Sequence, residues 1–322
     1  MDSYANVTEA TSGNIIKNND LYLKVIFIIL TIQGFVLIVS NGAVGLVLMK
    51  HQPLRRQYII LSAQIFADTS LGLGFFTAGI GRIIILTIGG FRITRRYCFL
   101  SEPMSAVGTL MVSTDRIVSL ICPMQYFEKN YAFQIRQIIF YFGSVSLFVL
   151  ISCIFSLRDN ESKLNGFCRS GDILKPLLAD ITSLVMVTST TLSVILYIIV
   201  YLLSRKHIRR IKSNQTEASL RSFEARQRKL TATMGVSCVC TLIFYVLPMC
   251  TKLLAYDDDN DPTTRYSELV RTASGISCNL NPLTNVAAIL IKQDDIALRV
   301  KQLFSKCIRK PDDRRMSFRI RE

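Results

Sequence analysis

The chain has 322 residues, of which 50% are hydrophobic and 19% charged, and its mean hydropathy is +0.35. This composition is too apolar for a soluble domain of this length, so it excludes an ordinary soluble protein. The formal net charge of +15 would suggest a nucleic-acid partner in a soluble chain. In a membrane protein the position of the charges matters more than their sum, and we expect no nucleic-acid partner.

Seven apolar runs follow one another along the chain, each at least as long as the roughly 20 residues that a helix needs to cross the hydrocarbon layer. The first run lacks the basic flank and small-residue cleavage site of a secretory signal peptide, so we interpret it as a true span. The predicted fold is an all-α membrane protein, a seven-transmembrane helix bundle, with membrane lipids as partners. The seven runs lie near residues 21–49, 58–88, 97–121, 138–157, 177–203, 230–254 and 269–291.

The predicted organisation has three parts. Residues 1–20 form an extracellular N-terminal segment, residues 21–291 form the transmembrane domain, and residues 292–322 form a cytoplasmic amphipathic helix with a basic tail. Lysine and arginine are concentrated between the fifth and sixth spans and after the seventh, which places both segments in the cytoplasm. We therefore expect a multi-pass protein of the plasma membrane with its N-terminus outside.

Other residues bear on this orientation. Glycosylation sequons at Asn6 and Asn160 both fall on the predicted outer face. The basic connection between the second and third spans disagrees with the charge rule, because it would also lie outside. Cys98, at the outer start of the third span, and Cys168, after the fourth, share the oxidising side and are expected to form a disulfide.

Some residues in the spans need a specific explanation. Asp68 lies near the middle of the second span, and Asp115-Arg116 ends the third. Ionisable groups at such positions are costly unless they face a polar interior, so each is either a structural group bonded to neighbouring helices or a functional one. For Asp115-Arg116 the structural interpretation is snorkelling at the helix end. Pro248 and Pro282 interrupt the last two spans and predict kinks or hinges there.

Taken in order, these residues resemble the rhodopsin-like G-protein-coupled receptors. Residues 113–118 have the sequence Ser-Thr-Asp-Arg-Ile-Val, and Pro123 and Tyr126 follow. This motif is similar to that of nematode chemosensory serpentine receptors of the srsx type. The broader resemblance rests on Asn41, Ala67-Asp68, Asp115-Arg116-Ile117, Pro248 and Asn281-Pro282-Leu283-Thr284-Asn285.

The resemblance implies a chemosensory receptor that converts binding of an extracellular small-molecule or peptide ligand into activation of a heterotrimeric G protein. It assigns G-protein coupling to Asp115 and Arg116, with Asp115 holding Arg116 in the resting state. No cofactor is required and no metal site is implied by the cysteines. The helix switch would comprise Pro248, Asn281, Pro282 and Asn285. The polar cluster that holds a sodium ion in many relatives would comprise Asp68, Asn41, Ser105 and Asn281.

Several positions depart from the family pattern. The chain has no tryptophan, so Val246 occupies the toggle position of the sixth span, and Asn285 replaces the usual tyrosine of the seventh. Arg228 stands where many relatives have a glutamate, so a resting-state lock of the usual kind is not expected. Either Tyr197 or Tyr201 matches the inner tyrosine of the fifth span. After the seventh span, an amphipathic pattern predicts a helix on the inner leaflet, where the resemblance implies palmitoylation of Cys307.

Two alternative interpretations remain open at this stage. A transporter would also use a mid-membrane aspartate and proline-broken helices, although we see no repeat between the two halves of the chain. The second concerns the third span, because Cys98 and Arg116 are about seven residues, or roughly 10 Å, closer than in the family. The sequence would then be either a shortened exon model or a receptor with impaired signalling. An enzyme is not expected, because none of the common catalytic motifs that we sought is present.

Overall fold

Helices make up nearly all of the computed structural model, which describes residues 3–88, 92–93, 102–157, 164–165, 176–211, 233, 235–254 and 264–309. The helices are α1 (Ser3–Lys50), α2 (Gln52–Gln57), α3 (Ile59–Ile88), α4 (Glu102–Ile121), α5 (Pro123–Leu157), α7 (Pro176–Ile211), the π-helix η2 (Leu242–Val246), α9 (Leu247–Leu254), α10 (Thr264–Lys292) and α11 (Asp294–Arg309). Two short strands, β1 (Arg92–Ile93) and β2 (Leu164–Asn165), pair antiparallel.

Five described helices are long and apolar enough to cross a membrane, and a shorter apolar helix covers Gly235–Thr251. Helix α10 has 29 residues and so the necessary length, but it carries more polar residues than the others. Four of them, Ser274, Asn279, Asn281 and Asn285, are buried inside the protein. A span whose polar residues face other helices needs fewer apolar residues than one surrounded by lipid. The prediction of an all-α, seven-helix membrane bundle is confirmed.

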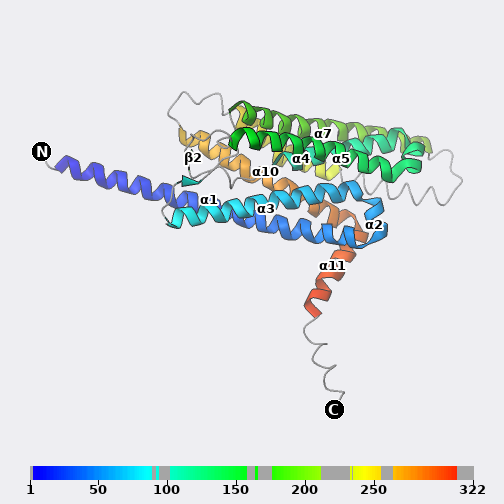
Figure 1. Cartoon of the computed structure of the whole chain (residues 1–322), viewed down its shortest axis with the longest axis horizontal. Helices are drawn as coiled ribbons and strands as arrows, with labels where there is room; N and C mark the ends of the chain where they lie inside the picture. Colours follow the sequence, from blue (N-terminus) through cyan, green and yellow to red (C-terminus); the bar gives the residue numbers. More distant parts are fainter. Residues whose placement is uncertain are drawn as a thin grey trace, which may run out of the picture.

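The helices form an elongated bundle (Figure 1). Helices α1 and α3 lie side by side, α4 packs against α5 and α7, and α10 contacts α1 and the sixth span. At one end of the bundle, where α2 joins α1 to α3, helix α11 leaves α10 and runs across the direction of the other helices (Figure 1). We call this the α2/α11 end, and the opposite end, where β1 and β2 lie, the strand end.

Close contact between α1 and α3 depends on glycine. A methyl group added at Gly72 would lie 2.7 Å from Cβ of Leu37, and one at Gly34 would lie 2.8 Å from the carbonyl oxygen of Gly72. Lipid supplies little hydrophobic driving force for helix association, so van der Waals contact between closely approaching backbones contributes much of it. The two glycines therefore permit the approach that holds α1 against α3.

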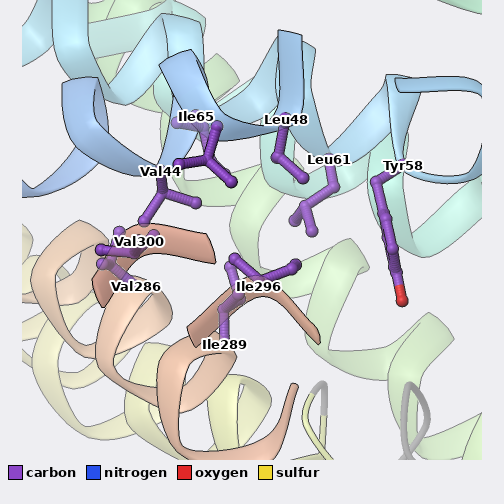
Figure 2. Close-up of a cluster of buried hydrophobic side chains, with 10 residues drawn as sticks. Val44, Leu48, Tyr58, Leu61, Ile65, Val286, Ile289, Ile296 and Val300 are labelled. Atoms are coloured by element: carbon purple, nitrogen blue, oxygen red, sulfur yellow. The ribbon is translucent and has the colours of Figure 1, made fainter. Parts of the chain in front are cut away.

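The largest buried cluster lies near the α2/α11 end and joins four helices (Figure 2). Val44 and Leu48 come from α1, while Ile296 and Val300 come from α11. Residues of α3 and α10 fill the space between them (Figure 2). Ile296 and Val300 lie one turn apart, as the predicted amphipathic pattern requires, so α11 is fixed to the bundle by its apolar face.

The strand pair was not predicted. Arg92 pairs with Asn165, and Ile93 pairs with Leu164. This pairing joins the two connections in which Cys98 and Cys168 occur. Both cysteines lie outside the described residues, so their disulfide stays a prediction.

Candidate functional site

A buried ion pair lies at the end of α4 toward the α2/α11 end. The Arg116 guanidinium is 3.3 Å from the Asp115 carboxylate, and the Asp115 side chain has no solvent exposure. Tyr126, near the start of α5, donates a hydrogen bond of 2.9 Å to the same carboxylate, and Gln134 donates one of 2.5 Å to the Tyr126 oxygen. A pair buried in this way does not fit snorkelling, in which the charged group reaches water.

Three tyrosine phenols, those of Tyr126, Tyr58 and Tyr197, lie near this pair. Burial, reinforced by the Asp115 carboxylate, raises the pKa of Tyr126, so its phenol stays protonated and can donate. Arg116 also interacts electrostatically with the phenols of Tyr58 and Tyr197. Its Nε atom is buried without a hydrogen-bond partner. The guanidinium therefore keeps one N–H donor, at Nε, that can bond to a further partner.

Asp68 lies about ten residues into α3, which runs over Ile59–Ile88, and is buried with 2% of its surface exposed. Ser105 of α4 donates a hydrogen bond of 2.5 Å to the Asp68 carboxylate. Asn41 of α1 is also fully buried, and its side-chain oxygen has no hydrogen-bond partner. Carboxylate, hydroxyl and amide oxygens are suitable ligands for a hard cation. The residues present therefore fit a sodium ion, with Asp68 as the only formal charge among them.

Asn281, the fourth predicted member of this cluster, bonds to a different partner. Its side-chain oxygen accepts a hydrogen bond of 2.9 Å from Thr241 of the sixth span. One turn along α10, Asn285 accepts a hydrogen bond from Ser237. Asn285 thus replaces the expected tyrosine with a short polar side chain that bonds directly to the sixth span. These two bonds couple α10 to the sixth span.

The sixth span is irregular just before Pro248. Because proline has no N–H group, the carbonyl of Phe244 loses the donor that an α-helix would supply, and the helix widens into the π-helix η2. Ser277 of α10 donates a hydrogen bond of 3.1 Å to this carbonyl. Val246, at the toggle position, is buried at the end of η2. The kink predicted from Pro248 is therefore a local break whose free carbonyl is satisfied by the neighbouring helix.

A cavity of about 40 Å³ lies between the Asp68 region and the α2/α11 end. Its lining includes Asp68, Asn285, Tyr197 and Gln293. Tyr201, the alternative inner tyrosine, is 52% exposed on the outside of α7 and does not line it. The cavity is large enough for one or two water molecules and has polar groups at both ends.

Five further predicted site residues lie wholly or partly outside the part of the chain that the structure describes. The side chains of Asn6 and Cys307, and the whole of Asn160, lie outside the described residues, as do Cys98 and its partner. The sequence alone does not distinguish the polar partners Gln134, Ser237, Thr241 and Gln293. They are neutral residues, and no single-sequence signal separates them from other polar residues near helix ends. Tyr126 belongs to the motif that resembles the serpentine receptors, but the sequence does not indicate its bond to Asp115.

The chain matches one protein-family model. Residues 58–305 match the family model described as serpentine type 7TM GPCR chemoreceptor Srv. No curated protein matches the chain. The match confirms the resemblance to chemosensory serpentine receptors. The type given by the family model is Srv, whereas the sequence motif around Arg116 resembles that of the srsx type.

Proposed function

The chain belongs to the Srv family of serpentine type 7TM GPCR chemoreceptors, and we propose that it converts the binding of an extracellular ligand into activation of a heterotrimeric G protein. The observation that carries this proposal is the buried Asp115–Arg116 pair, held by Tyr126 at the α2/α11 end. Burying an ion pair costs desolvation free energy that close contact and additional hydrogen bonds must offset, and here the Nε atom of the guanidinium has no hydrogen-bond partner. Arg116 is the group that would meet the G protein.

In this proposal the α2/α11 end is cytoplasmic and the strand end is extracellular. The basic segments after α7 and after α10 support this orientation. Ligand would enter between the helices at the strand end, and the sixth span would swing outward at the α2/α11 end. The hydrogen bonds from Ser237 and Thr241 to α10 would have to rearrange in that movement. Pro248 and η2 give the sixth span a place to bend.

The test compares three proteins at equal surface density: the parent, Arg116→Ala, and Arg136→Ala. Arg136 is an exposed arginine on α5, so its replacement controls for loss of one positive charge. Nucleotide exchange is measured on membranes supplied with a panel of purified heterotrimeric G proteins. We expect the parent and Arg136→Ala to raise exchange above receptor-free membranes, and Arg116→Ala to abolish the increase. Undiminished exchange with Arg116→Ala would refute the assigned role.

A second candidate is a receptor-like protein with impaired signalling. Helix α4 runs over 20 residues, Glu102–Ile121, whereas α3 has 30 residues and α7 has 36. Ser105 keeps its contact with Asp68, so the inner part of the third span is in place. Any shortfall would lie between Cys98 and Ser105, where ligand should bind. Sequencing the transcript across this segment decides the question, because extra residues would restore an ordinary third span. An unchanged transcript would leave impaired signalling as the live alternative.

A further inference from the structure

Gln293 occupies the junction between α10 and α11. Its backbone carbonyl accepts hydrogen bonds of 3.1 and 3.0 Å from the N–H groups of Ile296 and Ala297, so it starts α11. Its own N–H donates a bond of 2.8 Å to the carbonyl of Ile289 in α10. Although it lies between two helices, its side chain is buried with 5% exposure. The junction therefore places an amide inside the bundle at a fixed position.

The Gln293 amide bonds to two other elements. Its Nε2 atom donates a hydrogen bond of 3.1 Å to the Thr233 hydroxyl, at the foot of the sixth span. Its Oε1 atom accepts a hydrogen bond of 3.4 Å from the Tyr58 hydroxyl, which lies between α2 and α3. Tyr58 stands at the edge of the buried cluster, with its hydroxyl oxygen at the end of the ring away from the backbone (Figure 2). Thr233 and Tyr58 are each 3% exposed.

These contacts matter because the usual lock of the sixth span is not expected in this sequence, where Arg228 replaces the glutamate. We propose that Gln293, through its hydrogen bonds with Thr233 and Tyr58, is a neutral clamp that holds the foot of the sixth span at the α10–α11 junction in the resting state. This inference rests on the proposed function. Outward movement of the sixth span breaks the bond from Gln293 to Thr233. The bond from Tyr58 keeps the amide oriented, so the clamp closes again when the helix returns.

The chemistry of the clamp suits a switch. An amide–hydroxyl bond carries no net charge, so breaking it does not leave an unpaired ion inside the protein. The cavity beside it, which Thr233 and Gln293 both line, can supply water to the separated groups. The clamp therefore favours the resting state by a modest amount that ligand binding can overcome.

The experiment measures ligand-independent nucleotide exchange at equal surface density for substitutions within the clamp and for matched controls. Gln293→Leu removes both bonds, while Thr233→Val removes one hydroxyl with little change of shape. Thr233→Ser keeps the hydroxyl. Gln302→Leu makes the same chemical change as Gln293→Leu at an exposed position on α11, where the Gln302 side chain accepts a hydrogen bond from Arg299.

We expect Thr233→Val and Gln293→Leu to raise ligand-independent exchange about fivefold, the effect of losing roughly one net hydrogen bond. Thr233→Ser and Gln302→Leu should stay at the parent value. In the double variant Thr233→Val/Gln293→Leu the increases should not multiply, because both substitutions break the same bond. The clamp is wrong if Thr233→Val and Thr233→Ser behave alike, or if the two increases multiply independently.

A second readout separates failure of the clamp from failure of the proposed function. Cys238 lines the cavity, is partly buried and is a free thiol. Opening of the clamp should speed its labelling by a membrane-impermeant thiol reagent applied at the α2/α11 end, resolved at this site by mass spectrometry. If labelling rises about fivefold while no variant supports exchange, the clamp stands and G-protein coupling fails. If exchange depends on Arg116 but neither readout responds to Thr233→Val or Gln293→Leu, coupling stands and the clamp fails.

Discussion

The two ends of the bundle are built differently. At the α2/α11 end, ten buried apolar residues from four helices form one cluster, and two polar networks, around Asp115 and around Gln293, lie nearby. Toward the strand end, the described cluster consists of Ala106, Met186 and Met249. Methionine fills irregular space and repacks easily. Among the described residues, the end assigned to the G protein is therefore held by a larger apolar cluster and more polar contacts than the end assigned to the ligand.

The largest predicted effect tests this difference in packing. Ile296→Ala should lower the free energy of unfolding by about 2–4 kcal/mol, because Ile296 is fully buried between α1, α3 and α10. Met249→Ala should cost about 2 kcal/mol, the low end for a buried methionine, since Met186 can move into the space. Ile291→Ala, at a position with 73% exposure, is the control for removing an apolar side chain from α10. Thermal unfolding in detergent micelles provides the measurement, and equal losses at Ile296 and Met249 would erase the contrast.

The next effect concerns the contact between α1 and α3, which runs through both regions. Gly72→Ala should destabilise the protein by about 1–3 kcal/mol, because the new methyl group would overlap Leu37 and the Gly34 carbonyl. Gly81→Ala is the matched control on the same helix, where nothing lies within 4 Å. It should be neutral or stabilising by up to about 1 kcal/mol, since alanine favours helix more than glycine. Equal behaviour of the two variants in thermal unfolding would contradict the close approach.

A smaller effect is expected at Tyr126. Tyr126→Phe removes the hydrogen bond to Asp115 while keeping the ring, and a bond of this kind contributes about 1–2 kcal/mol. The resting state should weaken, and ligand-independent exchange should rise severalfold. Tyr131→Phe, at an exposed position on α5, should leave exchange unchanged. A fall in exchange with Tyr126→Phe would mean that the phenol supports the active state instead.

The smallest effect is expected at Asp68. If sodium binds there, replacing potassium by sodium should raise the melting temperature of the parent by a few degrees, as for any ligand that binds the folded state. Asp68→Asn should abolish the difference between the two salts, because it removes the only charge in the cluster. Identical melting temperatures of the parent in sodium and potassium would leave Asp68 with its structural role, the hydrogen bond from Ser105.

Most of the fold could be predicted because membrane spans are marked by length and hydropathy, which are local properties of sequence. The amphipathic pattern after the seventh span likewise predicted α11 and its apolar residues Ile296 and Val300. Helix ends were less predictable: α1 begins at Ser3 and α5 at Pro123, well before the apolar runs that indicated them. Polar helical turns outside the membrane carry no hydropathy signal, so their extent depends on packing and capping.

The candidate site was predicted where a residue is costly in lipid. Asp68, Asp115 and Arg116 stood out as ionisable groups in apolar runs, and all three are buried within the bundle. Gln293 and Thr233 did not stand out, because neutral polar residues near helix ends are ordinary. Their importance comes only from meeting across 60 positions of sequence. Predicting a tertiary contact of this kind requires knowing how the helices are arranged, and no local sequence pattern gives that arrangement.

The most direct test of the account uses two neighbouring residues that should act in opposite directions. Asp115→Asn removes the partner that holds Arg116 at rest, so ligand-independent nucleotide exchange should rise above the parent. Arg116→Ala removes the group that is proposed to meet the G protein, so exchange should fall to the value of receptor-free membranes. Both are measured on the same purified G protein at equal surface density. Opposite changes would support coupling through this pair, whereas an equal fall in both variants would show that the pair serves only to hold the fold.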